Sequence, residues 1–381
     1  MTPETLAPAA VAVVIPARNE SDRIDACLRA LAQSAGATGA HVILVANNCT
    51  DDTASRARAS AGRQRLSLSV IDCQLPPDRG VGSARRIGCA FAMRTLPGLA
   101  YLLTTDADSQ VAPDWIARSI SHLGEVAAVC GRIGPIESEQ HLLDALPAEA
   151  GLLEAQYRDL VLRFYHRFAP EPANPGLHHG EASGASLGFR ARDYRAIGGF
   201  ADLRCGEDRD IIRRLKQSGR AVRHADDVLA RVSCRLVGRA PGGMADALSM
   251  RLADPDSPVD DAFLPVDLLL EALRAGALPA WPPEVPAERR LRASDLPGEI
   301  ARLSRVLADP ELVHLGSPDP TVPAAIHLAP SPLDITTRFD IGPPIQRQSA
   351  PPGSAFSPSN DVPFPGTALQ PNSGAKKETT S

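Results

Sequence analysis

Four apolar runs alternate with stretches of helical periodicity over the first hundred residues, and this alternation constrains the fold most strongly. The runs cover residues 11–15, 41–46, 66–71 and 101–105. After the first run, Ile24, Cys27, Leu28 and Leu31 have the spacing of a buried helix face. Helices are also expected from Asp51 or Asp52 to Ala61 and over residues 80–93. Strands that are apolar throughout and alternate with helices predict an α/β fold, a mostly parallel sheet covered by helices on both faces.

Polar residues follow three of these expected strands directly. They occupy residues 16–20, 47–53 and 106–109. In open α/β sheets, ligands bind beyond the carboxyl ends of the strands. We therefore expect the functional site to be built from these three segments.

Composition excludes several classes of protein. The 381 residues include 40 Lys plus Arg against 45 Asp plus Glu, a balance that gives no basic surface for a nucleic acid. No apolar stretch approaches the roughly 18 to 20 residues of a transmembrane helix. Residues 1–10 carry no Lys or Arg, unlike a secretory signal. The seven cysteines are odd in number and form no CxxC pair, which argues against a zinc knuckle or a disulfide framework. A protein of the reducing cytoplasm is expected, with at most a peripheral membrane contact.

A last strand is expected at residues 228–232, and the pattern changes beyond about residue 240. Two helical stretches punctuated by proline are expected at 260–276 and 294–308, and a tail rich in Pro and Ser follows from about residue 317. We predict a catalytic domain over 1–243, a helical extension over 244–316 and a disordered tail over 317–381. The extension could cover an acceptor site, bind a partner, or simply pack against the domain.

Two acidic pairs could carry chemistry. Asp106 and Asp108 could lie on one side of a turn, as Mg²⁺ or Mn²⁺ bound to a diphosphate requires, or could be ordinary turn residues. Glu207 and Asp208 precede a helical stretch, where they could stabilise the helix dipole or include a general base for an acceptor hydroxyl. The small residues of 184–190 suit close approach of another molecule, or a tight turn.

Basic residues suggest where a phosphate could bind. Arg85 stands where the third glycine of a dinucleotide fingerprint should be, which excludes a Rossmann dehydrogenase. Arg85 could instead lie near phosphates at a helix start, or on a solvated surface. Arg235 and Arg239 lie in a glycine-rich segment that could close over a diphosphate or form a linker.

Histidines give a weaker indication. His224 could be a further metal ligand, although a lone histidine is more often structural. His178 and His179 could line an acceptor site.

Taken in order, these motifs resemble the family 2 glycosyltransferases, which have the GT-A fold with its Rossmann-like sheet. The resemblance covers about residues 10–243 and rests on Val13 to Glu20, Val45 to Thr53, Ala84 to Arg86, Thr105 to Ser109, Gly184 to Phe200 and Gly206 to Asp208.

The resemblance implies a role for each motif. Pro16, Arg18 and Glu20 would line the nucleotide site, with Glu20 near the ribose or base. Asp51 or Asp52 would meet the nucleobase, and Asn47 would also bind the nucleotide sugar.

The remaining motifs would bind the rest of the donor and the acceptor. Arg85, Asp106, Arg235 and Arg239 would contact the donor, and Asp108 would bind the metal. Asp208 would be the catalytic base, with Glu207 beside it shaping the acceptor site.

The implied reaction is a metal-dependent, inverting transfer of one sugar from a nucleotide sugar, most often uridine-linked in this family, to a hydroxyl of a small molecule, glycan or lipid. The Gln-x-x-Arg-Trp motif of processive members is absent, which disfavours a polysaccharide synthase. A retaining transferase of GT-A fold and an inactive nucleotide-sugar-binding scaffold remain as alternatives. A sugar-nucleotide pyrophosphorylase is disfavoured, because residues 16–20 contain no glycine.

Overall fold

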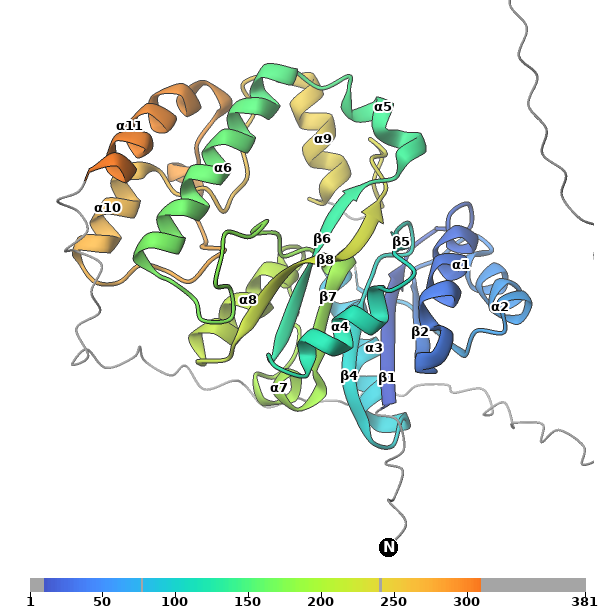
Figure 1. The fold of residues 1–381 in the computed structure, drawn as a ribbon. Helices are drawn as coiled ribbons and strands as arrows, with labels where there is room; N and C mark the ends of the chain where they lie inside the picture. The colour runs from blue at the N-terminus through green and yellow to red at the C-terminus, as the bar shows by residue number, and fades with distance from the viewer. Residues whose placement is uncertain (1–9, 77, 240–241, 310–381) are drawn as a thin grey trace, which may run out of the picture. The chain divides into compact units, whose positions relative to one another are not determined.

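An eight-stranded mixed sheet is the centre of the fold (Figure 1). The computed structural model describes residues 10–76, 78–239 and 242–309, so the tail expected at 317–381 lies outside the described residues. The strands are β1 (Ala10–Ala17), β2 (His41–Asn47), β3 (Leu68–Cys73), β4 (Leu99–Thr104), β5 (Gln110–Val111), β6 (Ala128–Pro135), β7 (Leu187–Arg190) and β8 (Val222–Val232). Their order across the sheet is β3-β2-β1-β4-β7-β6-β8-β5.

The prediction of a mostly parallel sheet is confirmed. β1 pairs in parallel with β2 and β4, β2 with β3, and β6 with β8. β7 runs antiparallel to both of its neighbours, and β5 runs antiparallel to β8. Because β1, β2 and β4 run in one direction, their carboxyl ends meet at one edge of the sheet.

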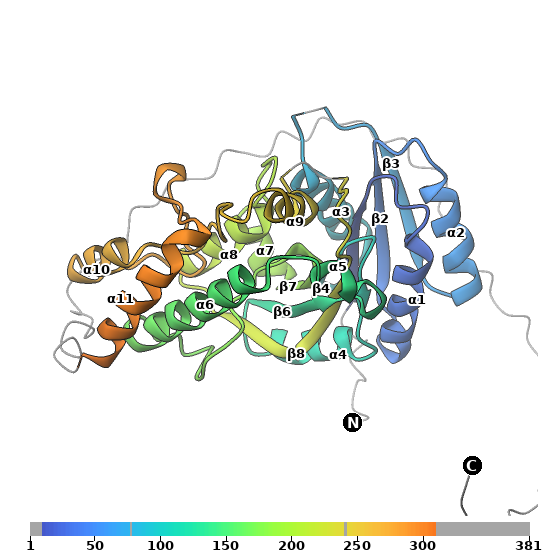
Figure 2. The same ribbon diagram turned by 90° about the horizontal axis from the view of Figure 1, so that it is seen from above.

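Helices cover both faces of this sheet (Figure 2). The α-helices are α1 (Ile24–Ala35), α2 (Thr53–Gln64), α3 (Val81–Thr95), α4 (Trp115–Leu123), α5 (Gln140–Leu143), α6 (Ala148–Phe168), α7 (Ala191–Ala196), α8 (Glu207–Gln217), α9 (Met244–Ala253), α10 (Val266–Arg274) and α11 (Leu296–Ala308). Residues of α1, α2 and α4 share one hydrophobic core with the sheet, and residues of α3, α7 and α8 share the other.

Apolar periodicity located these elements well, but some of their ends were wrong. The helix expected at 260–276 begins only at Val266, because Pro265 precedes it and Asp260 accepts a hydrogen bond from the Ala262 amide in a turn. β8 begins at Val222 rather than at the predicted residue 228. The first half of β8 was not predicted as a strand because it contains the charged residues Arg223, Asp226 and Asp227.

A third hydrophobic core joins α6 to the C-terminal extension. Tyr157 of α6 packs edge-to-face on Phe263 with ring centroids 5.7 Å apart, and its hydroxyl donates to the Leu264 carbonyl oxygen at 2.6 Å. Leu269 of α10 and Leu303 of α11 are fully buried in the same core. The helical extension therefore packs on a helix that belongs to the expected catalytic domain.

Candidate functional site

The guanidinium of Arg85 connects the end of β4 to the start of α8. Arg85 lies on α3 and is only 3% exposed. Its Nη1 donates to Glu207, the first residue of α8, and its Nη2 donates to Asp106, which follows β4. The contact brings together residues more than 100 positions apart in the sequence. The sequence predicted a donor contact for Arg85, but both of its terminal nitrogens bind carboxylates of the chain itself.

The backbone of Gly184 passes directly against this guanidinium. A Cβ atom on Gly184 would lie 2.2 Å from Cζ of Arg85, so only glycine fits without moving the arginine. Thr104 Oγ1 donates to the Gly184 carbonyl oxygen at 2.8 Å and holds this backbone beside β4. The close approach that the small residues of 184–190 indicated is therefore made by the Arg85 side chain.

Burial and ion pairing oppose each other at this contact. Burial alone would lower the pKa of Arg85, but Asp106 and Glu207 raise it overall. Burial raises the pKa of Glu207 to about 7, and Arg85 opposes that shift. Arg85 is therefore a permanent cation that holds two carboxylates of different elements.

Asp208 is fixed by two backbone amides. Its Oδ2 accepts from the Gly184 amide at 3.0 Å, and its Oδ1 accepts from the Arg209 amide at 2.8 Å. Asp208 remains partly exposed at the start of α8. Each carboxylate oxygen has a second lone pair, so Asp208 can still accept a proton while its orientation is held.

A second arginine connects two further predicted residues. Arg235 binds Glu20 through both terminal nitrogens, at 2.8 and 2.5 Å, and its Nη2 lies 2.9 Å from Oδ2 of Asp108. Glu20 is only 4% exposed. Three residues predicted from separate motifs therefore form one cluster, although Glu20 faces Arg235 and not an open nucleotide site.

The two aspartates of the 106–108 turn bind different arginines. Asp106 binds Arg85 and Asp108 binds Arg235. Burial, followed by the charge of Asp106, raises the pKa of Asp108 to about 7, and Arg235 lowers it. The two carboxylates thus interact with each other through space.

The residues of this turn fit a divalent cation whose remaining ligands come from a bound substrate. Among residues 10–76, 78–239 and 242–309, no three His, Cys, Asp or Glu side chains are arranged to hold a metal ion. Asp106 and Asp108 each bond an arginine through one oxygen, Oδ1 and Oδ2 respectively. The opposite oxygen of each carboxylate has no protein partner in the described part of the chain. Mg²⁺ is commonly held by one or two carboxylates that are completed by substrate phosphates.

The other predicted nucleotide contacts lie around the same edge of the sheet. Pro16 is buried within β1, Arg18 is exposed, and Asn47 is the last residue of β2. Asp51 accepts hydrogen bonds from the Thr53 amide and hydroxyl and from the Ser21 amide. Its slight burial would raise its pKa, but these bonds lower it to about 2. Asp51 therefore ties the start of α2 to the β1–α1 loop.

His224 lies away from the Asp106–Asp108 turn. It pairs with Cys130 on β6, whereas Arg231, seven residues along β8, pairs with Gln110 beside that turn. At about 3.3 Å per residue this places His224 about 20 Å along the strand. Its Nδ1 lies 3.0 Å from the Glu181 carbonyl oxygen, and its ring stacks on His178 at 4.3 Å. The structure does not bring His224 to the expected metal site.

His178 and His179 belong to this same buried group. Burial lowers the pKa of each to about 4. Their rings pack on the ring of His224, so the three imidazoles form one neutral cluster.

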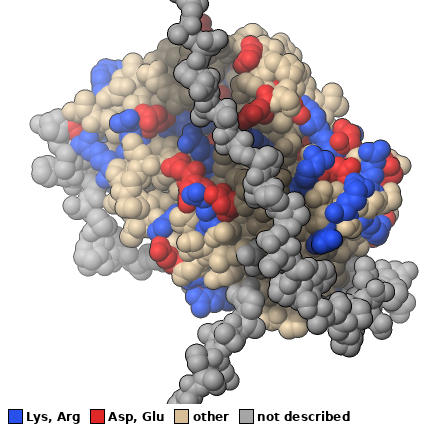
Figure 3. All heavy atoms as spheres, turned by 45° about the vertical axis from the view of Figure 1, so that its right-hand side comes forward, with Lys and Arg blue, Asp and Glu red and all other residues tan. Residues whose placement is uncertain are grey.

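Arg239 lies at the margin of the site. It is 3.8 Å from Asp22, and its side chain is 38% exposed. On the face shown in Figure 3, acidic and basic side chains lie next to one another.

Two partners of this site were missed by sequence reasoning. Glu139 binds Arg23, and it also accepts from the Ser233 hydroxyl at 2.9 Å and from the Cys234 amide at 2.8 Å, directly before Arg235. Nothing in the local sequence marks Arg23 or Glu139, because their pairing depends on the approach of α1 to the end of β6.

Arg209 was also missed. It follows Asp208, and its Nη1 and Nη2 bind the two oxygens of Asp260 at 2.8 and 3.0 Å. It binds Asp261 as well. This contact joins the start of α8 to the C-terminal extension.

Comparison with known proteins agrees with the order of motifs. Residues 12–180 match the family model described as Glycosyl transferase family 2. No curated protein matches the chain.

Solved structures with a related arrangement share little sequence with the chain. S. aureus TarS 1-349 in complex with UDP-GlcNAc is 16% identical, with a TM-score of 0.44, and the match covers 64% of this chain and 65% of that one. A mannosyltransferase from Pyrobaculum calidifontis in complex with GDP-Man and Mn²⁺ is 21% identical, with a TM-score of 0.43, covering 65% and 62%. The M. tuberculosis glucosyl-3-phosphoglycerate synthase is 19% identical, with a TM-score of 0.37, covering 64% and 77%. The chain thus spans slightly less than two thirds of the first two.

None of the helices that the structure describes is both long and apolar enough to cross a membrane.

Proposed function

We propose that this glycosyltransferase, whose residues 12–180 belong to glycosyl transferase family 2, transfers one sugar from a uridine-linked nucleotide-diphosphate sugar to an acceptor hydroxyl. The observation that carries the proposal is the pair of arginine clusters at the carboxyl edge of the sheet. Arg85 joins Asp106 to the start of α8, and Arg235 joins Asp108 to Glu20. The residues expected to bind the donor and the expected general base therefore lie around the same turn, that of Asp106 and Asp108.

The donor side of the site would be the 106–108 turn. Asp106 and Asp108 would hold Mg²⁺ or Mn²⁺ through the oxygens that the arginines leave free. When bound, the cation neutralises charge that develops on the departing diphosphate. Arg235 would shift from Asp108 toward that diphosphate, since the glycines after it permit movement.

Asp208 would act as the general base. It would take the proton of the acceptor hydroxyl while the acceptor oxygen bonds to the anomeric carbon and the bond from that carbon to the diphosphate breaks. This single displacement inverts the anomeric centre. The two backbone amides on Asp208 support this role, because they fix its orientation without removing its capacity to accept a proton.

Arg85 would position these groups without binding a phosphate. Its guanidinium is buried, and both terminal nitrogens are occupied by Glu207 and Asp106. It would keep the base helix at a constant distance from the donor turn.

Binding and turnover test these assignments separately. A panel of nucleoside diphosphates and nucleotide sugars is added with and without Mn²⁺, and the melting temperature of the full chain is followed. At about 100 times its dissociation constant a ligand adds about 2.7 kcal/mol, a rise of about 5 °C or more. Asp108→Ala should lose the metal-dependent rise. Asp114→Asn, directly before α4, should keep the metal-dependent rise.

Asp208→Asn should keep donor binding and lose about 10²- to 10⁴-fold in sugar transfer, measured as product formed with a panel of acceptors. If the protein binds the donor but transfers no sugar, and Asp208→Asn changes neither result, the inactive nucleotide-sugar-binding scaffold is supported instead. Retention of the anomeric configuration in the product would contradict single displacement.

A further inference from the structure

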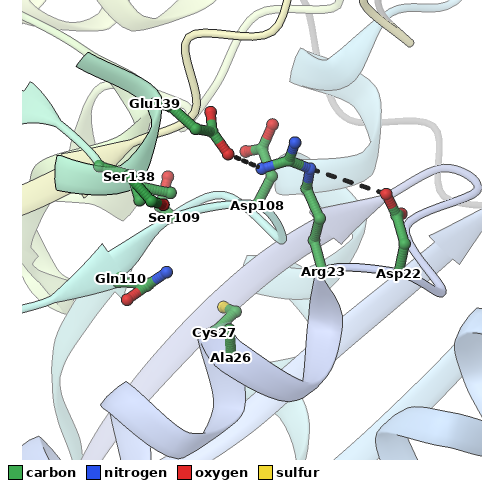
Figure 4. A pocket seen from close by; sticks show the side chains of 10 residues that line it. Asp22, Arg23, Ala26, Cys27, Asp108, Ser109, Gln110, Ser138 and Glu139 are labelled. Carbon is green, nitrogen blue, oxygen red and sulfur yellow. Dashed lines mark hydrogen bonds and ion pairs between the residues drawn. The ribbon is translucent and has the colours of Figure 1, made fainter. Parts of the chain in front are cut away.

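Among the described residues, Arg235 is the one cation that bonds Asp108. Its Nη2 lies 2.9 Å from Oδ2 of Asp108, while the same guanidinium binds both oxygens of Glu20 at 2.8 and 2.5 Å. Figure 4 shows Arg23 close to Asp108, but the Arg23 guanidinium turns to Glu139. Arg235 therefore supplies the counter-charge that Asp108 bonds in the predicted metal turn.

The backbone around Arg235 is anchored on both sides. Before it, the Cys234 amide donates to Glu139 at 2.8 Å. After it, the Ser249 hydroxyl of α9 donates to the Leu236 carbonyl oxygen at 2.6 Å. The side chain of Arg235 is only 17% exposed. These contacts fix the resting place of the guanidinium, so its pairing with the two carboxylates is a built feature of the fold.

Arg235 would compete with a divalent cation at the 106–108 turn. It bonds Oδ2 of Asp108 only, so it opposes the cation by its charge and not by filling both oxygens. Asp108 lines a cavity of about 230 Å³ beside α1, and its side chain is 19% exposed, so an ion from solvent can reach it. Like charges a few ångströms apart repel strongly at a partly buried site. Metal binding should therefore be weak for as long as Arg235 stays at Asp108.

A diphosphate is the chemical group that resolves this competition. It carries at least two negative charges and accepts paired hydrogen bonds from an arginine, as a carboxylate does. Once Arg235 has moved to a diphosphate, the Asp108 carboxylate is free of its counter-charge, and phosphate oxygens add further ligands for a cation. Each ligand then favours the binding of the other by the same factor, because the coupling between two sites is reciprocal.

We propose that Arg235 is an internal counter-cation that makes a divalent metal and a nucleoside diphosphate bind together and not separately. While Arg235 pairs with Asp108 it disfavours the metal by its charge, and a bound diphosphate releases Asp108 by taking the guanidinium. The inference rests on the proposed function for the identity of the diphosphate ligand. It deepens that function, because it assigns Arg235 an effect on metal affinity before any donor is bound.

Electron paramagnetic resonance of free Mn²⁺ measures the affinity of the full chain for the metal, alone and with saturating UDP. The titrations are made at pH 8, so that Asp108, whose pKa is raised to about 7 by burial and by Asp106, is mostly ionised. The wild-type chain should bind Mn²⁺ weakly alone and much more tightly with UDP. Arg235→Gln should bind Mn²⁺ alone at least about tenfold more tightly than the wild type. UDP should tighten metal binding less in this variant, because the competing charge has gone.

Three variants control this result. Arg231→Gln, four residues earlier on the chain, removes a partly exposed pair with Glu137 and should leave the Mn²⁺ affinity unchanged within about twofold. Glu20→Gln loosens the cluster but keeps the guanidinium beside Asp108, so it should give no gain in affinity. Combining Arg235→Gln with Glu20→Gln removes the buried carboxylate that Arg235→Gln alone leaves unpaired, so this double variant should fold and keep the gain.

The outcomes separate the two proposals. Equal affinity of the wild type and both Arg235 variants for Mn²⁺ alone, or an equal gain in Glu20→Gln, overturns the role of Arg235, while metal-dependent nucleotide binding leaves the proposed function standing. Tighter metal binding by Arg235→Gln in a chain that binds no nucleoside diphosphate overturns the proposed donor and keeps the competition at Asp108. No Mn²⁺ binding by any variant, with or without nucleotide, overturns both.

Discussion

Replacing Arg85 with methionine should destabilise the protein strongly, because it leaves a buried carboxylate without its counter-charge. The side chains of Arg85 and Glu207 are 4% and 2% exposed, and Glu207 has no other cation bound to it in the described structure. Removing one partner of a buried ion pair costs about 3–5 kcal/mol. At about 2 °C per kcal/mol, the melting temperature should fall by about 6–10 °C.

Urea denaturation at pH 7 measures this cost, and two further variants control it. Arg63→Met removes a pair with Asp25 of which both side chains are exposed, at 59% and 38%, so it should cost less than about 1 kcal/mol. Adding Glu207→Gln to Arg85→Met removes the uncompensated charge and should restore at least about 1 kcal/mol. The reasoning is refuted if Arg85→Met costs no more than Arg63→Met, since the guanidinium would then be hydrated and would not connect the two elements.

Three other substitutions have defined outcomes. Gly184→Ala places a methyl group 2.2 Å from the Arg85 guanidinium and should cost about 1–3 kcal/mol in urea denaturation; a neutral effect would mean that the arginine moves freely. Arg209→Gln breaks the paired hydrogen bonds to Asp260 and should lower the unfolding free energy by about 2 kcal/mol. It should also reduce sugar transfer more than donor binding. Equal losses of transfer and donor binding would assign Arg209 a purely structural role. Burial, followed by Lys216, holds the pKa of His224 well below its usual 6.5, so the folded protein binds fewer protons than the unfolded chain and loses stability as the pH falls below 6.5, by up to about 1.4 kcal/mol per unit. His224→Gln should therefore reduce the difference in unfolding free energy between pH 7 and pH 5 by up to about 2 kcal/mol, and an unchanged difference would contradict a neutral buried imidazole.

The candidate site was partly predictable, because strand ends are visible locally. Residues 11–15, 41–46 and 101–105 are apolar enough to be recognised as buried strands, and parallel strands bring their carboxyl ends to one edge. That reasoning is sufficient to place Glu20, Asp51 and Asp106 at a common edge. It cannot give the direction of their side chains, and Glu20 turns inward to Arg235 while Asp51 holds the start of α2.

The sequence by itself determined the α/β class, the helices and strands of the first hundred residues, and the segments that meet at the carboxyl edge of the sheet. Those properties depend on periodicity over ten to fifteen neighbouring residues, which the order of amino acids contains directly. Only the tertiary structure decided which charges meet. Arg85 reaches Glu207, Arg235 reaches Glu20, and His224 lies far from the Asp106–Asp108 turn, because pairing across more than 100 residues depends on how strands are ordered in the sheet and how helices pack on it.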